Sequence, residues 1–272
     1  MTKKALIVGC SLTAGFKLHE NTDANTSGHC DPSNPRIWSN QLLSQLDDFE
    51  IQNISKAGVN NNWIFMEAMS ALTQVHYDLV LIQWTFLDRL YFPVGLELYD
   101  TNTMLTGERD VDLVNKVTLS AQWLRDVGRR MRLLHNYHWD ILNLVRYVTA
   151  LKTIQDHRQA KVCFVNGAIN WSQDFFTRKQ ISFPCELSQF EKNMIDWDNR
   201  DDADIVSIYN MIHDQYAASG SCQLENWLNI YNPLLLQKID TVAPNDIHPG
   251  YLSQDLFVKT LLPALTKYYY KD

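Results

Sequence analysis

The chain has 272 residues, of which 46% are hydrophobic, and its formal net charge is −7. This length suits one large α/β domain or two small ones, with ample apolar material for a core. The acidic balance and the lack of a basic block exclude nucleic acid as an expected partner. Five scattered cysteines with no CxxC pair argue against disulfides and zinc, so we expect a cytoplasmic protein. We also expect no metal and no cofactor. No apolar run is long enough to cross a membrane, and no secretory leader is expected.

The first fifteen residues contain the most informative stretch. Residues 5–8 are apolar and predict a buried strand, which ends at Gly9 and turns at Ser11. Residues just beyond the carboxyl end of such a strand lie at the mouth of an α/β crevice, where a hydroxyl between Gly9 and Gly15 can act as a nucleophile. Equally, Ser11 can cap a following helix. A nucleotide site is disfavoured, because the two glycines lack both the GxGxxG spacing and a P-loop lysine.

Two further strand-to-loop junctions follow along the chain. After a polar loop, helical spacing predicts a helix over 36–46, and alternating apolar and polar residues predict a strand over 49–54. A helix over 63–75 is expected next. Gly58 lies between that second strand and its helix, where its backbone N–H can bind an oxyanion or simply form a turn. A third buried strand over 78–83 runs into Trp84 and Thr85. Strands that alternate with helical sequence predict a parallel sheet with right-handed crossovers.

The second half of the chain predicts long insertions and a closing helix. Residues 90–111 are irregular in pattern, 112–157 have helical spacing, and 161–165 predict a fourth strand. We expect a mainly helical insertion around 90–157 and a lid over the cleft at 168–204, within a single domain spanning 1–272. Near the C-terminus, Asp246 and His248 lie in a Pro- and Gly-bounded loop before a helix over 251–265. The pair can supply a base and its orienting carboxylate, or Asp246 can merely cap the helix.

Taken together, three short blocks resemble the SGNH hydrolases, also called GDSL-type esterases. Ile7-Val-Gly-Cys-Ser-Leu-Thr13 is similar to their first block, Ala57-Gly-Val-Asn-Asn61 to the second, and Asp246-Ile-His-Pro249 to the last. The Gly-Val-Asn-Asn and Trp-Thr-x-x-Asp-Arg elements are also similar to a branch of polysaccharide-related members. The resemblance implies a three-layer α/β/α fold with a flavodoxin-like parallel sheet. It also implies a Ser11–His248–Asp246 triad that cleaves esters without metal, with oxyanion donors at the N–H groups of Ser11 and Gly58.

The chain departs from this family pattern at two places. Cys10 stands where the first block usually has Asp, and the third strand ends Gln83-Trp84-Thr85, without the usual Gly-x-Asn. We therefore expect Thr85 or Asn60 as the third oxyanion donor. Loss of such a donor typically lowers the rate by about two to three powers of ten.

The substrate expected from this pattern is a small-molecule or carbohydrate ester. Trp84 is predicted to stack on a sugar ring, and Asn61 is predicted to bind substrate. This favours a carbohydrate O-acetylesterase. A sugar O-acetyltransferase using the same serine, and a catalytically degenerate carbohydrate-binding module, are the alternatives. The sequence leaves the oligomeric state open.

Overall fold

The fold is given by a computed structural model, which divides into two compact units. The first comprises Met1–Phe86, Val145–Asn170 and Tyr216–Asp272, and the second comprises Leu87–Leu144 and Trp171–Gln215. The structure describes residues 2–18, 30–46, 49–87, 89, 91–94, 97–100, 111–112, 118–120, 122–123, 126–127, 137–168, 226–229, 233–244, 246 and 248–271. No helix among them is long and apolar enough to cross a membrane.

The first unit is built on a four-stranded parallel sheet in the order β2-β1-β3-β8. The strands are β1 (Lys3–Val8), β2 (Phe49–Asn53), β3 (Leu79–Trp84) and β8 (Lys161–Asn166). β3 is buried along its whole length, as expected for a near-continuous apolar run in the middle of a parallel sheet. A parallel bridge from Phe164 to Trp227 extends the sheet beyond β8. This is the flavodoxin-like strand order, so all four predicted strands and the predicted fold class are confirmed.

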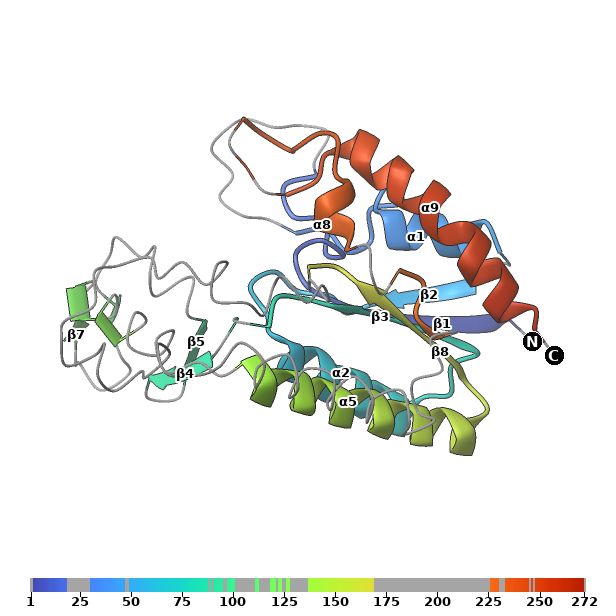
Figure 1. Cartoon of the computed structure of the whole chain (residues 1–272), viewed down its shortest axis with the longest axis horizontal. Coiled ribbons are helices and arrows are strands. Elements are labelled where there is room, and N and C mark those ends of the chain that lie inside the picture. The colour runs from blue at the N-terminus through green and yellow to red at the C-terminus, as the bar shows by residue number, and fades with distance from the viewer. Residues whose placement is uncertain are drawn as a thin grey trace, which may run out of the picture. The chain divides into compact units, whose positions relative to one another are not determined.

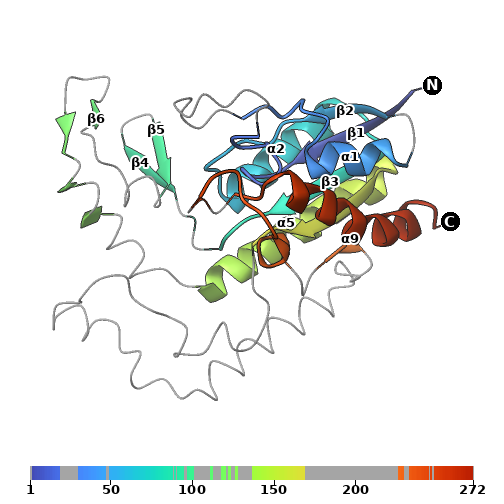
Figure 2. The same ribbon diagram turned by 90° about the horizontal axis from the view of Figure 1, so that it is seen from above.

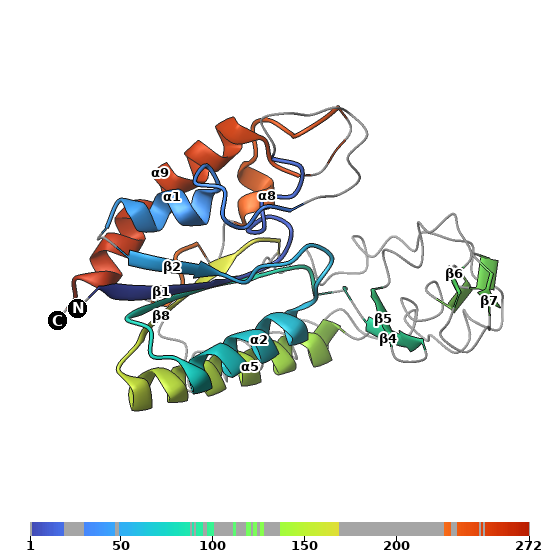
Figure 3. The same ribbon diagram turned by 180° about the vertical axis from the view of Figure 1, so that it is seen from behind.

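Helices cover both faces of this sheet, which gives the three layers predicted from the sequence. α1 and α9 lie on one face, and α2 and α5 on the other, as two opposite views show (Figures 1 and 3). Seen from above, α1 and α9 lie over the strands (Figure 2). The helices of this unit are α1 (Trp38–Ser44), α2 (Asn61–Gln74), residues 145–158 of α5 (Tyr137–Arg158), α8 (Leu234–Gln237) and α9 (Tyr251–Tyr269).

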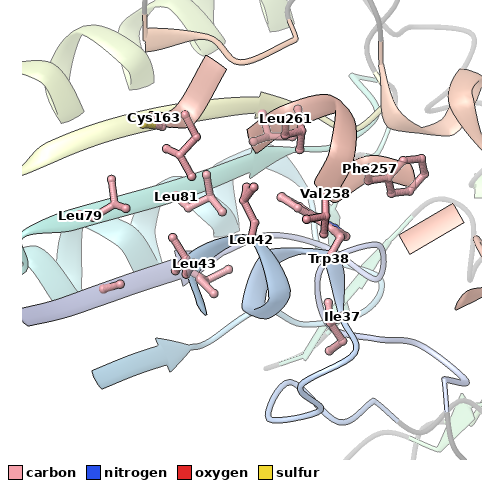
Figure 4. Packing of buried hydrophobic residues seen from close by; sticks show 14 of the residues in the cluster. Ile37, Trp38, Leu42, Leu43, Leu79, Leu81, Cys163, Phe257, Val258 and Leu261 are labelled. Carbon is pink, nitrogen blue, oxygen red and sulfur yellow. The ribbon is translucent and has the colours of Figure 1, made fainter. Parts of the chain in front are cut away.

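The main core lies between the sheet and the α1–α9 layer. Leu81 on β3 and Leu42 on α1 are fully buried there, next to Leu261 of α9 (Figure 4). Phe257, Leu261 and Leu265 recur every fourth residue of α9, which is the spacing of one helix face. This packing places α9, and with it the loop before α9, against the same sheet that carries Ser11 at the end of β1.

The second unit differs from the predicted helical insertion. Its described strands form two antiparallel pairs, β4 (Tyr91–Val94) with β5 (Glu97–Asp100) and β6 (Val111–Asp112) with β7 (Thr118–Leu119). The prediction of helix from residue 112 is therefore wrong at its start, because apolar spacing in a short window fits helix and strand alike. The helical prediction is confirmed along α5. The predicted lid at 168–204 lies outside the described residues except for residue 168, and a single domain stays a prediction.

Candidate active site

Ser11 lies in a tight turn at the carboxyl end of β1. Thr13 and Ala14 both donate their backbone N–H groups to the carbonyl of Cys10, at 2.9 Å each. At Gly9 a Cβ atom would lie 2.6 Å from the Thr13 hydroxyl oxygen, so only glycine lets the turn fold back this closely. Residues 11–17 form turns and not a helix, so the alternative that Ser11 caps a following helix is wrong.

His248 meets Ser11 across 237 residues of sequence. Its Nε2 lies 3.1 Å from the Ser11 Oγ, and its Nδ1 lies 2.6 Å from the Asp246 Oδ1. With the Nδ1 proton directed to the carboxylate, Nε2 is left as the acceptor for the serine proton. The sequence predicted that these three residues meet, and the structure brings them together in the hydrogen-bond order that a serine nucleophile requires.

The loop before α9 holds the imidazole and carboxylate in place. Asp246 Oδ1 also accepts the backbone N–H of His248 at 2.9 Å, which ties the carboxylate to its own loop. Thr241 and Pro249 form an antiparallel bridge at the base of this loop. Asp240 then accepts the N–H of Ser253 at 2.7 Å and so caps the first turn of α9. Asp240, and not Asp246, therefore caps α9.

Two residues that follow Ser11 in the same stretch of turns, Phe16 and Lys17, also contact the Asp–His pair. The sequence patterns indicated neither contact. The Phe16 ring lies 4.3 Å from the His248 ring, centroid to centroid. The Lys17 Nζ lies 3.0 Å from the second oxygen, Oδ2, of Asp246. Partial burial opposes ionisation of this carboxyl group. The hydrogen bonds from His248 and from Lys17 outweigh that effect and hold the pKa of Asp246 well below its ordinary value.

The turn that carries Ser11 is also braced from β3 by a buried glutamine. Gln83 Oε1 lies 2.9 Å from the Thr13 hydroxyl oxygen, 3.2 Å from the Cys10 backbone nitrogen and 3.2 Å from its sulfur. The Gln83 amide nitrogen donates to the backbone carbonyl of Trp84. The two departures from the family pattern, at Cys10 and at Gln83, are therefore in direct contact. The sequence indicated each departure but not their pairing.

The loop after β2 lies beside this turn, because the Lys56 N–H donates to the Gly9 carbonyl at 3.1 Å. Gly58 has a φ of +78°, a conformation that favours glycine. Asn60 is the N-cap of α2, and its Oδ1 accepts the Trp63 N–H at 2.9 Å. Its side chain is partly exposed, and no described residue accepts a hydrogen bond from its amide nitrogen. The cap therefore fixes the orientation of the Asn60 amide group.

Asn61 and Thr85 are engaged with each other. The Asn61 side chain accepts the Thr85 N–H at 2.8 Å and donates to the Thr85 carbonyl at 3.2 Å. This amide pair joins the start of α2 to the end of β3, and the substrate role of Asn61 stays a prediction. The Thr85 hydroxyl is fully buried and has no partner among the described residues.

Trp84 does not reach a surface where a sugar could stack. Its side chain is 0% exposed, and its ring stacks with those of Phe164 and Tyr147, at centroid distances of 6.0 and 6.4 Å. Neighbouring residues of a strand point to opposite faces. Because Gln83 points toward the Ser11 turn, Trp84 points away from it into the core beside α5. The structure thus contradicts the prediction that Trp84 binds carbohydrate.

No protein-family model matches the chain, and no curated protein matches it. Solved structures do show similar folds. The psychrotrophic esterase EstA from Pseudoalteromonas sp. is 14% identical, with a TM-score of 0.45 over 99% of this chain and 100% of that one. A lipolytic G-D-S-L family member from Veillonella parvula is 10% identical, with a TM-score of 0.44 over 98% and 100%. A family two carbohydrate esterase from Clostridium thermocellum, in complex with cellohexaose, is 10% identical, with a TM-score of 0.42 over 97% and 64%.

Proposed function

We propose that this protein is a serine-dependent ester hydrolase with Ser11 as its nucleophile. The observation that carries the proposal is the continuous chain of contacts from the Ser11 Oγ through both ring nitrogens of His248 to Asp246. A serine hydroxyl is a weak nucleophile on its own and needs such a base, oriented by a third group. Among the alternatives, a degenerate binding module has no need of this alignment.

In the proposed reaction, His248 Nε2 takes the proton of Ser11 as the Oγ attacks the ester carbonyl. The tetrahedral intermediate collapses when the protonated imidazole gives that proton to the leaving alkoxide, which forms the acyl-enzyme and the alcohol. Water then attacks the acyl group and transfers a proton to His248. The second collapse releases the acid and returns the proton to Ser11. Asp246 keeps Nδ1 protonated throughout and stabilises the imidazolium that forms twice in each cycle.

For the oxyanion, the proposed donors are the backbone N–H groups of Ser11 and Gly58 and the side-chain amide of Asn60. Asn60 is preferred over Thr85 as the third donor because a group that contacts substrate must be accessible. The Asn60 side chain is partly exposed, whereas Thr85 is 0% exposed. The helix-capping bond at Asn60 Oδ1 fixes this side chain before substrate arrives, and such preorganisation is what makes an oxyanion donor effective.

For the substrate, we propose the broad class of small acyl esters. The preference for carbohydrate rested on Trp84, and the burial of Trp84 removes that support. Acetylated sugars stay in the panel to be tested, because a serine that forms an acyl-enzyme can pass the acyl group either to water or to a sugar hydroxyl. Release of free acetate distinguishes hydrolysis from transfer.

The test compares wild type, Ser11→Ala and Ser44→Ala on short-chain acyl esters and acetylated sugars. Ser44 is an exposed serine at the end of α1, outside the site, and serves as the matched control. Loss of the nucleophile should lower kcat/KM by at least about 10³-fold, whereas the control should keep full activity. Equal hydrolysis by wild type and Ser11→Ala would refute the proposal. Labelling of Ser11 by a fluorophosphonate probe provides a second readout that needs no knowledge of the substrate.

A further inference from the structure

The turn that carries Ser11 also places the Lys17 ammonium group beside the Asp246 oxygen that does not contact His248. Asp246 uses its two oxygens differently: Oδ1 faces His248, with the ring nitrogen at 2.6 Å and the backbone nitrogen at 2.9 Å. Oδ2 faces Lys17 Nζ at 3.0 Å. The Asp246 side chain is only 12% exposed, so its bond with Lys17 is partly shielded from water.

The local backbone is shaped so that Lys17 can make this contact. Lys17 has a φ of +58°, which is uncommon for a residue with a side chain. The preceding residue, Phe16, packs its ring on His248 at 4.3 Å, while Lys17 Nζ lies 5.3 Å from the same phenyl ring. The phenyl ring therefore contacts the imidazole and the ammonium together. Asn and Gly adopt this backbone conformation most readily, so a lysine here points to a use for its charge.

We propose that Lys17 is a fourth member of this hydrogen-bonded system, a positioning residue that sets the pH at which His248 becomes a base. Two effects follow from its place on Oδ2. The ion pair holds the carboxylate so that Oδ1 stays aligned with the imidazole. Its positive charge also offsets part of the Asp246 charge, which makes the imidazolium form of His248 less favourable than beside an unpaired carboxylate. Lys17 thereby favours the form of His248 that can accept the Ser11 proton.

The charges that face the Asp–His pair determine the direction of the effect. Among the described residues, Asp246 contacts Lys17 from the Ser11 turn and His248 from its own loop. Removing the lysine cation leaves the full carboxylate charge to stabilise the imidazolium. The midpoint of the His248 titration should therefore rise, by about half to one pH unit for a partly exposed charge one group away from the ring. High salt should shrink this difference.

Two variants separate the charge of Lys17 from its structural role. Lys17→Asn removes the cation but suits the left-handed backbone, so the turn should still fold. Lys17→Arg keeps the cation. The His248 ring is titrated by NMR in the full-length protein, with His248→Asn used to assign its resonance. We expect a raised midpoint in Lys17→Asn and, with the charge kept, a change within about 0.2 pH unit in Lys17→Arg.

The kinetic consequence rests on the proposed function, whereas the titration does not. If Lys17→Asn raises the midpoint, the acid limb of kcat/KM should move up equally and lower activity on that limb by about three- to tenfold. An unchanged or lowered midpoint in Lys17→Asn, or an equal rise in both variants, would overturn the role of Lys17. If wild type hydrolyses no ester, the proposed function fails, while the titration still decides the role of Lys17.

Discussion

The two halves of the candidate site use their polar groups in different ways. In the triad half, the contacts of Ser11, His248 and Asp246 run directly from one functional group to the next. The oxyanion half comprises Gly58, Asn60, Asn61 and Thr85. There the Asn61 amide holds the backbone of Thr85, and the Asn60 Oδ1 caps α2. Proton transfer needs side chains that contact each other, whereas an oxyanion site needs donors held still and aimed at an empty place. Most polar side chains of the oxyanion half therefore hold the backbone in place.

The largest effect is expected when the carboxylate of Asp246 in the triad half is replaced. Asp246→Asn keeps the shape of the side chain but lets it donate a hydrogen bond to Nδ1, which favours the wrong imidazole tautomer. We expect kcat/KM to fall by about 10³- to 10⁴-fold, measured on the best ester of the panel. The control is fluorophosphonate labelling of Ser11, which should slow in parallel. Unchanged kcat/KM in this variant would show that His248 acts without Asp246.

The next effect tests Asn60, the proposed side-chain donor of the oxyanion half. Asn60→Ser keeps an oxygen that can cap α2 but removes the amide donor. If Asn60 is the third oxyanion donor, kcat should fall by about 10²- to 10³-fold with little change in KM. The free energy of unfolding should change by only a few tenths of a kcal/mol, because Asn and Ser are similar N-caps. A normal kcat would exclude Asn60 as the third oxyanion donor and leave Thr85 as the other candidate predicted from the sequence.

The sequence predicted the triad half better than the oxyanion half, for a physical reason. β1, β3 and β8 each contain a run of apolar residues, and parallel strands bring their carboxyl ends to one edge, so Ser11 could be placed without knowledge of side-chain direction. The roles of Trp84 and Asn61 depended on that direction. At the end of β3, the alternation of faces turns Gln83 toward the nucleophile turn and Trp84 into the core. Lys17 was not predictable, because its contact with Asp246 depends on the backbone conformation of the turn and on side-chain direction, which no sequence motif marks.

A smaller effect is expected where β3 braces the nucleophile turn. Gln83→Leu removes the acceptor shared by the Thr13 hydroxyl and the Cys10 N–H and leaves both buried donors without this partner. We expect the free energy of unfolding to fall by about 2–4 kcal/mol, measured by urea denaturation. In a double-mutant cycle with Thr13→Val, the second change should matter less once Gln83 is gone. Independent, additive losses would show that the two side chains are not coupled.

The smallest expected effect concerns the buried hydroxyl at the end of β3. Thr85→Val replaces the unpartnered Oγ1 with a methyl group of similar size, while the backbone bonds to Asn61 remain. A buried hydroxyl without a partner is unfavourable, so the variant should be more stable, by about 0.5–1 kcal/mol, with kcat within about twofold of wild type. Urea denaturation and ester hydrolysis measure the two quantities. A tenfold or larger loss of kcat would instead make Thr85 the oxyanion donor, which requires substrate binding to expose its hydroxyl, and would reduce Asn60 to a helix cap.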